Sequence, residues 1–221
     1  MQIFSSTTRV PPAAASTKSS TREPQGLHLL LTRVRSDLSR QARGSLIAFT
    51  APNPGAGVSH VVRFFAEKLA VQTRRRTLVV DAPRLRELDF AGVMNTPGPF
   101  AQTSVPNLWS LPTRVDPSTG ETLLQEATWQ DESEWGLSPL PALTASFSYT
   151  LIDCPSLGTS YDAELLAPEV DGIVLVVEAD KTKRAEILRA RRTIEMANGK
   201  VMALVLNKRR HVVPGWLYRM L

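Results

Sequence analysis

Two glycines and a serine form the stretch with the clearest chemical potential in this sequence. Residues 54–59 read Pro-Gly-Ala-Gly-Val-Ser and follow the apolar run Ser45–Thr50. A glycine-rich turn between a buried strand and a helix presents backbone N–H groups and the positive end of the helix dipole to a phosphate. The complete phosphate-loop pattern ends in Gly-Lys-Ser/Thr, and here Val58 stands in place of the lysine. The sequence therefore predicts a loop shaped for phosphate that lacks the charge used in phosphoryl transfer.

Two carboxylates end other apolar runs. Asp81 closes Thr77–Asp81, and Asp153 closes Tyr149–Asp153. In a parallel sheet the ligand crevice lies beyond the carboxyl ends of the strands, so both are expected near the glycine loop. Asp153 is then a candidate to hold Mg²⁺ through water with Ser59 as the other ligand, and Asp81 and Asp153 are the catalytic candidates if the chain is active. The alternative is that Asp153 caps the following turn and Ser59 caps the helix.

Hydrophobic periodicity predicts the elements that position these residues. Unbroken apolar runs are typical of buried strands, and apolar residues spaced three and four apart indicate amphipathic helices. We expect strands at Ser45–Thr50, Thr77–Asp81, Leu108–Leu111, Tyr149–Asp153, Gly172–Glu178 and Lys200–Asn207, and helices at Leu27–Gln41, from His60 onward, at Glu121–Gln130 and at Thr182–Asn198. This order predicts an α/β fold of three layers, a doubly wound and mainly parallel sheet with helices on both faces.

Composition bounds the domain organisation and the class of protein. Residues 1–26 are rich in Ser, Thr, Ala and Pro and are expected to be a disordered tail, whereas 27–221 form the α/β domain, with a divergent, proline-rich part at 93–148. There is no apolar run of about 18 residues. The single cysteine, Cys154, excludes an internal disulfide and fits the cytoplasm. The net charge of +5 is compatible with anionic lipid, nucleic acid or an acidic partner. The clusters of lysine and arginine in the sequence lack interleaved aromatic residues for stacking on bases, so nucleic acid is not expected.

Five segments resemble a known family in the same order. They are Pro54–Ser59 (the family has Pro-Gly-Glu-Gly-Lys-Ser/Thr), Leu78–Asp81, Leu151–Pro155 (the Walker B Asp-x-Pro element), Asp162–Val177 and Val205–Asn207. Together they resemble the MinD/ParA-like branch of P-loop ATPases, and most of all the cytoplasmic domain of the bacterial tyrosine kinases (CpsD/CapB and Wzc type) of capsule and exopolysaccharide synthesis. This resemblance implies a nucleotide site made of Gly55, Ala56, Gly57, Val58, Ser59, His60 and Asn207, the last beside the base.

The sequence also departs from that family. The second acidic motif, Asp-x-Asp-x-Arg, lacks its second carboxylate, because Asp81 is followed by Ala-Pro-Arg-Leu. The upstream Glu-x-x-Arg-x-x-Arg motif for subunit contact matches only at Arg35, and the terminal tyrosine cluster is reduced to Tyr218. These losses favour a pseudo-ATPase or pseudokinase with weak or no activity, in which ATP or ADP and Mg²⁺ bind weakly or not at all.

By the resemblance, such a protein would be an accessory protein of exopolysaccharide or capsule synthesis and export. It would dock on a membrane chain-length (co-polymerase) protein at the inner face of the plasma membrane, with self-association and contact with anionic lipid as further expectations. Two alternatives stay open. One is an active kinase or ATPase that uses Arg63, Arg84 or Arg86 in place of the lysine, and the other is a MinD/ParA-type positioning protein that binds membrane or DNA.

Overall fold

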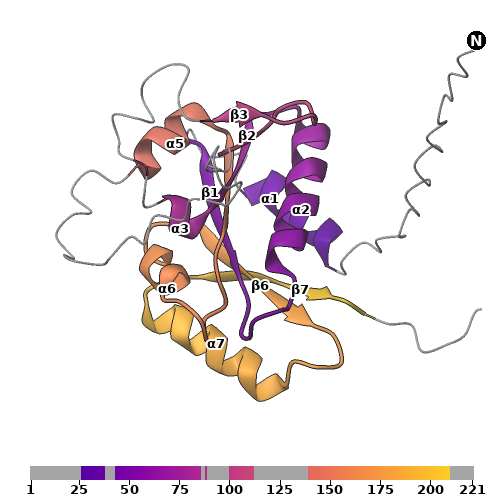
Figure 1. Ribbon diagram of the computed structural model, residues 1–221, viewed down its shortest axis with the longest axis vertical. Coiled ribbons are helices and arrows are strands. Elements are labelled where there is room, and N and C mark those ends of the chain that lie inside the picture. The colour runs from indigo at the N-terminus through magenta and orange to yellow at the C-terminus, as the bar shows by residue number, and fades with distance from the viewer. Residues whose placement is uncertain (1–25, 38–42, 86–87, 89–99, 112–138, 210–221) are drawn as a thin grey trace, which may run out of the picture.

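The computed structural model describes residues 26–37, 43–85, 88, 100–111 and 139–209 (Figure 1). The strands are β1 (Ser45–Thr50), β2 (Thr77–Asp81), β3 (Ala101–Gln102), β4 (Leu108–Ser110), β5 (Tyr149–Asp153), β6 (Gly172–Glu178) and β7 (Val201–Asn207). The helices are α1 (Leu27–Asp37), α2 (Val58–Thr73), α3 (Ala82–Leu85), α5 (Leu140–Ser146), α6 (Asp162–Leu166) and α7 (Arg184–Met196). The strands form one sheet in the order β3-β4-β2-β5-β1-β6-β7, in which only the β3–β4 pair is antiparallel.

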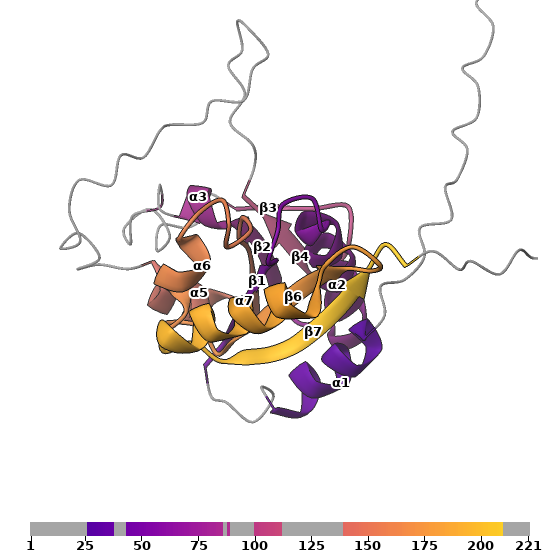
Figure 2. The same cartoon turned by 90° about the horizontal axis from the view of Figure 1, so that it is seen from below.

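Helices cover both faces of this sheet, as Figures 1 and 2 show. Successive side chains of a strand point to opposite faces. In β1 every residue is buried: Ile47 and Phe49 pack with α1 and α2, whereas Leu46 and Ala48 pack with α3, α5, α6 and α7. A strand buried on both faces needs apolar residues at every position, which is why β1 reads as an unbroken apolar run. The predicted three-layer, mainly parallel α/β fold is confirmed.

Most of the predicted elements lie within a residue or two of their expected bounds. The strands predicted at Ser45–Thr50, Thr77–Asp81, Tyr149–Asp153 and Gly172–Glu178 are confirmed as β1, β2, β5 and β6. Two short helices, α3 and α5, were not predicted; both contain a proline near their start, where the missing N–H has no helical partner to lose.

Other predictions fall outside the described residues. These are the N-terminal tail, the end of the helix predicted to Gln41 and the helix at Glu121–Gln130. Within the divergent part, the structure describes β3, β4 and α5. Among the helices that the structure describes, none has the length and apolar character needed to cross a bilayer.

Candidate functional site

The glycine loop joins the end of β1 to the start of α2. Gly55 has φ of +81° and Gly57 has φ of +85°, a left-handed conformation that glycine adopts without steric cost. The N–H of Val61 donates to the carbonyl of Gly57 at 3.1 Å, so the first turn of α2 is anchored on this glycine. The helix N-terminus therefore opens at the carboxyl edge of the sheet, which is the backbone geometry of an anion-binding turn.

Asn207, the last residue of β7, fixes the loop from one side. Its side chain is buried, and Nδ2 donates to the carbonyl oxygen of Ala56 at 2.9 Å. A Cβ atom on Gly57 would lie 2.5 Å from the same nitrogen, closer than real Cβ contacts allow. In this structure the amide nitrogen of Asn207 donates to the loop itself, and its place beside a base stays a prediction.

Lys208 brings a positive charge to the side of the loop that lies next to the end of β7, which we call the outer side. Its Nζ donates to the carbonyl oxygen of Gly55 and lies 3.5 Å from Oε2 of Glu178, which also pairs with Lys181 at 3.3 Å. In a trans peptide the N–H and C=O groups point in opposite directions. The N–H of Ala56, which shares a peptide group with the carbonyl of Gly55, therefore points away from this lysine. Lys208 contacts the loop on the side opposite to that N–H group.

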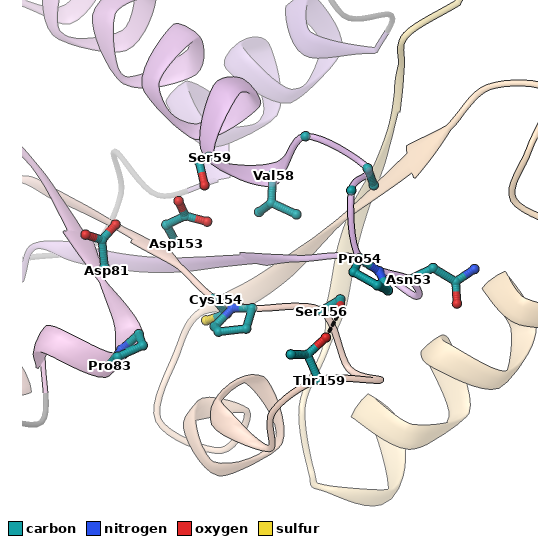
Figure 3. Close-up of a pocket in the computed structure, with 14 residues that line it drawn as sticks. Asn53, Pro54, Val58, Ser59, Asp81, Pro83, Asp153, Cys154, Ser156 and Thr159 are labelled. Atoms are coloured by element: carbon teal, nitrogen blue, oxygen red, sulfur yellow. Dashed lines mark hydrogen bonds between the residues drawn. The ribbon is translucent and has the colours of Figure 1, made fainter. Parts of the chain in front are cut away.

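A cavity of about 480 Å³ lies beneath the inner side of the loop (Figure 3). It is lined by the loop, the end of β2, the start of α3 and the segment that follows β5. The side chain of Val58 points into it, and the hydroxyls of Ser156 and Thr159 on its far wall bond to each other at 2.7 Å. Among the described residues that line this cavity none is a lysine or arginine, whereas Asp81 and Asp153 both are carboxylates. We call this cavity the loop crevice.

The two carboxylates of the loop crevice are held side by side by the sheet. Asp81 pairs with Asp153 in the parallel register of β2 and β5. Burial raises the pKa of Asp153 from 3.8 to about 6, with a smaller upward contribution from the Asp81 charge, while a hydrogen bond from Ser59 and the positive charge of Arg63 act in the opposite direction. Asp153 is therefore mostly ionised at neutral pH, and the crevice carries negative charge where a phosphate would enter.

Of the three arginines proposed as replacements for the lysine, the two that the structure describes do not line the loop crevice. Arg63 and Arg84 line a neighbouring cavity on the other side of Asp81, and Arg86 lies outside the described residues. His60, predicted with the nucleotide-binding loop, is exposed on α2 beside Phe64, with ring centroids 6.5 Å apart, and does not line the crevice. The sequence analysis missed Lys208, which directly follows the predicted Asn207.

The oxygen donors expected for a metal are present in part. Mg²⁺ is normally held by one or two carboxylates together with phosphate oxygens, and Ser59 and Asp153 offer a hydroxyl and a carboxylate next to each other. Within the described part of the chain, no three His, Cys, Asp or Glu residues gather as a metal site of their own. The donors thus fit a Mg²⁺ ion shared with phosphates, but the described residues that line the crevice include no side-chain cation for those phosphates.

Comparisons with known proteins find relatives of this chain. No protein-family model matches the chain. It is 28% identical over 180 residues to tyrosine-protein kinase CpsD of Streptococcus agalactiae, covering 74% of this chain and 75% of that protein. It is also 29% identical over 176 residues to the succinoglycan biosynthesis transport protein ExoP of Rhizobium meliloti (strain 1021), covering 74% of this chain and 22% of ExoP.

Solved structures show the same fold. The BceF tyrosine kinase domain superimposes with a TM-score of 0.58 at 23% identity, covering 81% of this chain and 75% of that one. MinD of Pyrococcus horikoshii OT3, complexed with Mg-ADP, gives a TM-score of 0.53 at 16% identity, covering 80% and 76%. The fold is that of the MinD-like P-loop proteins. Within that class the chain is a relative of the bacterial tyrosine kinases of the CpsD and CapB type, which confirms the resemblance stated from the sequence.

Proposed function

We propose that this chain is a degenerate P-loop protein that serves exopolysaccharide or capsule synthesis and export with weak or no transfer of phosphate. The names of its relatives support the process: CpsD is called a tyrosine-protein kinase, and ExoP a succinoglycan biosynthesis transport protein. The chain acts by binding a membrane chain-length (co-polymerase) protein at the inner face of the plasma membrane. Its contribution is assembly, and bond cleavage is weak or absent.

The charge of the loop crevice carries this proposal. Phosphoryl transfer depends on cations that stabilise charge on the transferred group, and loss of one preorganised stabiliser typically costs about 3–4 kcal/mol. Here Val58 replaces the lysine, and the crevice instead holds Asp81 and Asp153. A triphosphate would meet two carboxylates and no lining side-chain cation among the described residues. ATP or ADP and Mg²⁺ therefore bind weakly or not at all.

Calorimetric titration with Mg-ATP tests the crevice directly. The wild-type chain is expected to show no saturation at micromolar nucleotide, whereas Val58→Lys should bind at least about tenfold more tightly, because one charge-assisted hydrogen bond returns to an otherwise intact loop. Val58→Met is the matched control, since methionine is similar in length to lysine and carries no charge. Micromolar binding by the wild type, or Mg²⁺-dependent phosphate release that Asp153→Ala abolishes, would instead establish the active alternative.

Docking is tested with a defined pair of proteins. The chain is co-expressed with the chain-length protein encoded nearest to it, and the detergent-solubilised complex is isolated. Thr159→Trp, which fills the wall of the loop crevice, is expected to weaken the complex, whereas Gln72→Trp, exposed near the end of α2, leaves it unchanged. Equal recovery of both variants would show that the crevice is not the docking surface.

A second candidate function, contact with an anionic membrane, is favoured by the outer face of α7. Leu188 is 45% exposed and Met196 is 85% exposed, and Arg192 lies between them at four-residue spacing. Residues four apart share one face of a helix, so this face combines apolar side chains with arginine, as membrane-surface helices do. Arg184 and Arg189 on the same helix are also exposed.

Vesicle sedimentation separates this candidate from DNA binding. Binding to vesicles that contain phosphatidylserine, and not to pure phosphatidylcholine, should weaken with salt and fall with Arg192→Glu. Arg75→Glu, exposed between α2 and β2, is the control and should retain binding. A steep salt-dependent affinity for duplex DNA that exceeds the vesicle affinity would favour the positioning-protein alternative.

A further inference from the structure

A second cavity lies beside the loop crevice and has a different chemical character. Its volume is about 260 Å³, and it opens where β2 and β4 end, with Asp81 lining both cavities. It is smaller than the roughly 300–1,000 Å³ typical of sites for drug-sized ligands. We call it the side cavity; its size suits a single functional group on a short stem.

Cationic and hydroxyl groups line the side cavity. Arg63 stands four residues after Ser59 on α2 and therefore on the same face of the helix. Arg84, from α3, donates through Nη1 to the carbonyl of Leu111 at 2.9 Å, which fixes its guanidinium at the wall. Thr103 and Ser110 line the cavity as well; the Thr103 hydroxyl donates to the carbonyl of Val105 at 3.4 Å, so Ser110 is the hydroxyl donor offered to a ligand. Guanidinium and hydroxyl donors together are the usual partners of carboxylate and phosphate oxygens.

Other walls of the side cavity are apolar. Leu108 is 6% exposed and packs in the core with α2, while Val79 and Val105 pack against that same core. The segment before β4 is held in shape, because the N–H of Val105 donates to the hydroxyl of Thr103 at 3.1 Å. Apolar walls next to positively charged hydrogen-bond donors favour a ligand with one anionic end and one apolar end.

The carboxylates limit how much negative charge the side cavity accepts. Asp81 and Glu67 also line it, so the formal charges of its two arginines and two acids cancel. A nucleoside triphosphate is too large for this volume, and it carries more negative charge than the two arginines can balance. A ligand with a single anionic group adds only one negative charge to this balanced set of side chains.

We propose that the side cavity is a binding site for one carboxylate or phosphate monoester group carried on a short apolar stem, with Arg63 as its principal cationic partner. The site is distinct from the loop crevice, although the two share Asp81, and its ligand is held by the guanidinium and hydroxyl donors while the stem lies against Val79, Val105 and Leu108. It operates whether or not the crevice binds a nucleotide.

Nuclear magnetic resonance titration of the full chain tests this site. The probes are phenyl phosphate, phenylacetate and, as a neutral match, benzyl alcohol. We expect saturable shifts of the Thr103–Leu111 amides with at least one anion and at least tenfold weaker effects with benzyl alcohol. Tighter binding of phenyl phosphate assigns the phosphate class, and tighter binding of phenylacetate assigns the carboxylate class. Equal effects of all three probes, or shifts confined to other regions, would overturn the proposal.

Variants of α2 make the test specific. Arg63→Gln should weaken the anion at least tenfold, and Arg63→Lys should recover part of that loss, because it restores the charge without the planar fork. Lys68→Gln, exposed on the same helix outside the cavity, is the matched control and should bind like the wild type. Unchanged affinity in Arg63→Gln, in a variant with wild-type amide dispersion, would contradict the proposal. The probes contain no nucleotide, so this outcome is independent of the Mg-ATP titration of the loop crevice.

Discussion

The outer and inner sides of the glycine loop differ in how well they are supported. On the outer side, Asn207 and Lys208 donate to successive loop carbonyls, and Gly57 packs closely against the Asn207 amide. On the inner side, a valine points into a cavity with two carboxylates and no lining side-chain cation among the described residues. The difference teaches that the contacts which shape a phosphate loop and those which neutralise a phosphate are separate sets of residues. In this chain the first set is present and the second is incomplete.

The largest expected effect comes from the close packing on the outer side. Gly57→Ala should lower the free energy of unfolding by about 4 kcal/mol, because a left-handed alanine is strained and its Cβ displaces the buried Asn207 amide from its hydrogen bond. Gly55→Ala is the matched control: its φ is also positive, but no atom lies within 4 Å of the new Cβ, so we expect a loss of only about 1–2 kcal/mol. Urea denaturation measures both. Equal losses would show that the Asn207 contact does not stabilise the loop.

The burial of Asp153 on the inner side of the loop should make the free energy of unfolding depend on pH. The pKa of Asp153 is about 6 in the folded chain and 3.8 without the fold, so the folded state holds the proton more tightly. That stabilisation is present below pH 4 and is lost as the pH rises through 6, a fall of up to about 3 kcal/mol in the free energy of unfolding.

Asp153→Asn tests this assignment, because it keeps the side-chain shape without the charge. In EDTA, its free energy of unfolding should fall by less between pH 4 and 7 than that of the wild type, and the fall that remains includes that of Glu164, whose pKa burial also raises. Asp180→Asn, at an exposed position with positive φ that asparagine tolerates, is the control and should keep the wild-type curve. A wild-type curve that is flat over this range would contradict the burial of the Asp153 charge.

The smallest effect is expected at Lys208, the more exposed of the two residues that donate to the loop carbonyls. Lys208→Met should cost about 1 kcal/mol, since its side chain is 47% exposed and solvent screens the interaction with Glu178. Lys181→Met removes the other lysine beside Glu178 and, at 72% exposure, should change stability little. Hydrogen exchange of the loop amides checks the local effect: faster exchange in Lys208→Met alone supports the contact with Gly55, and equal exchange in both variants argues against it.

The parts of the fold that could be predicted from the sequence are those with local signatures. β1, β5 and β6 are buried on both faces and read as unbroken apolar runs, and Asp81 and Asp153 were placed by the rule that parallel strands end at one edge. The short helices α3 and α5 have too few residues to show a periodicity. Their positions depend on packing against the sheet, which the local sequence does not encode.

The contacts that complete the site could not be predicted because they join distant residues. Asn207 and Ala56 are 151 positions apart, and Lys208 and Gly55 are 153 apart. The side cavity likewise combines α2, α3 and the segment around β4, and weak periodicity in that last segment left it largely uninterpreted. The sequence itself shows that the loop lysine is absent, but no local signal indicates that Lys208 contacts the loop at Gly55.

The in-register pairing of β2 with β5 has one more consequence. Asp81 and Asp153 stand at paired positions of two neighbouring strands in the interior of the sheet, so their backbones stay adjacent as long as the two strands remain paired. Substituting either residue therefore alters the electrostatic surroundings of the other, and the stability changes of Asp81→Asn and Asp153→Asn should be non-additive in a double-mutant cycle. The alignment of the two strands thus couples the charges of these two aspartates.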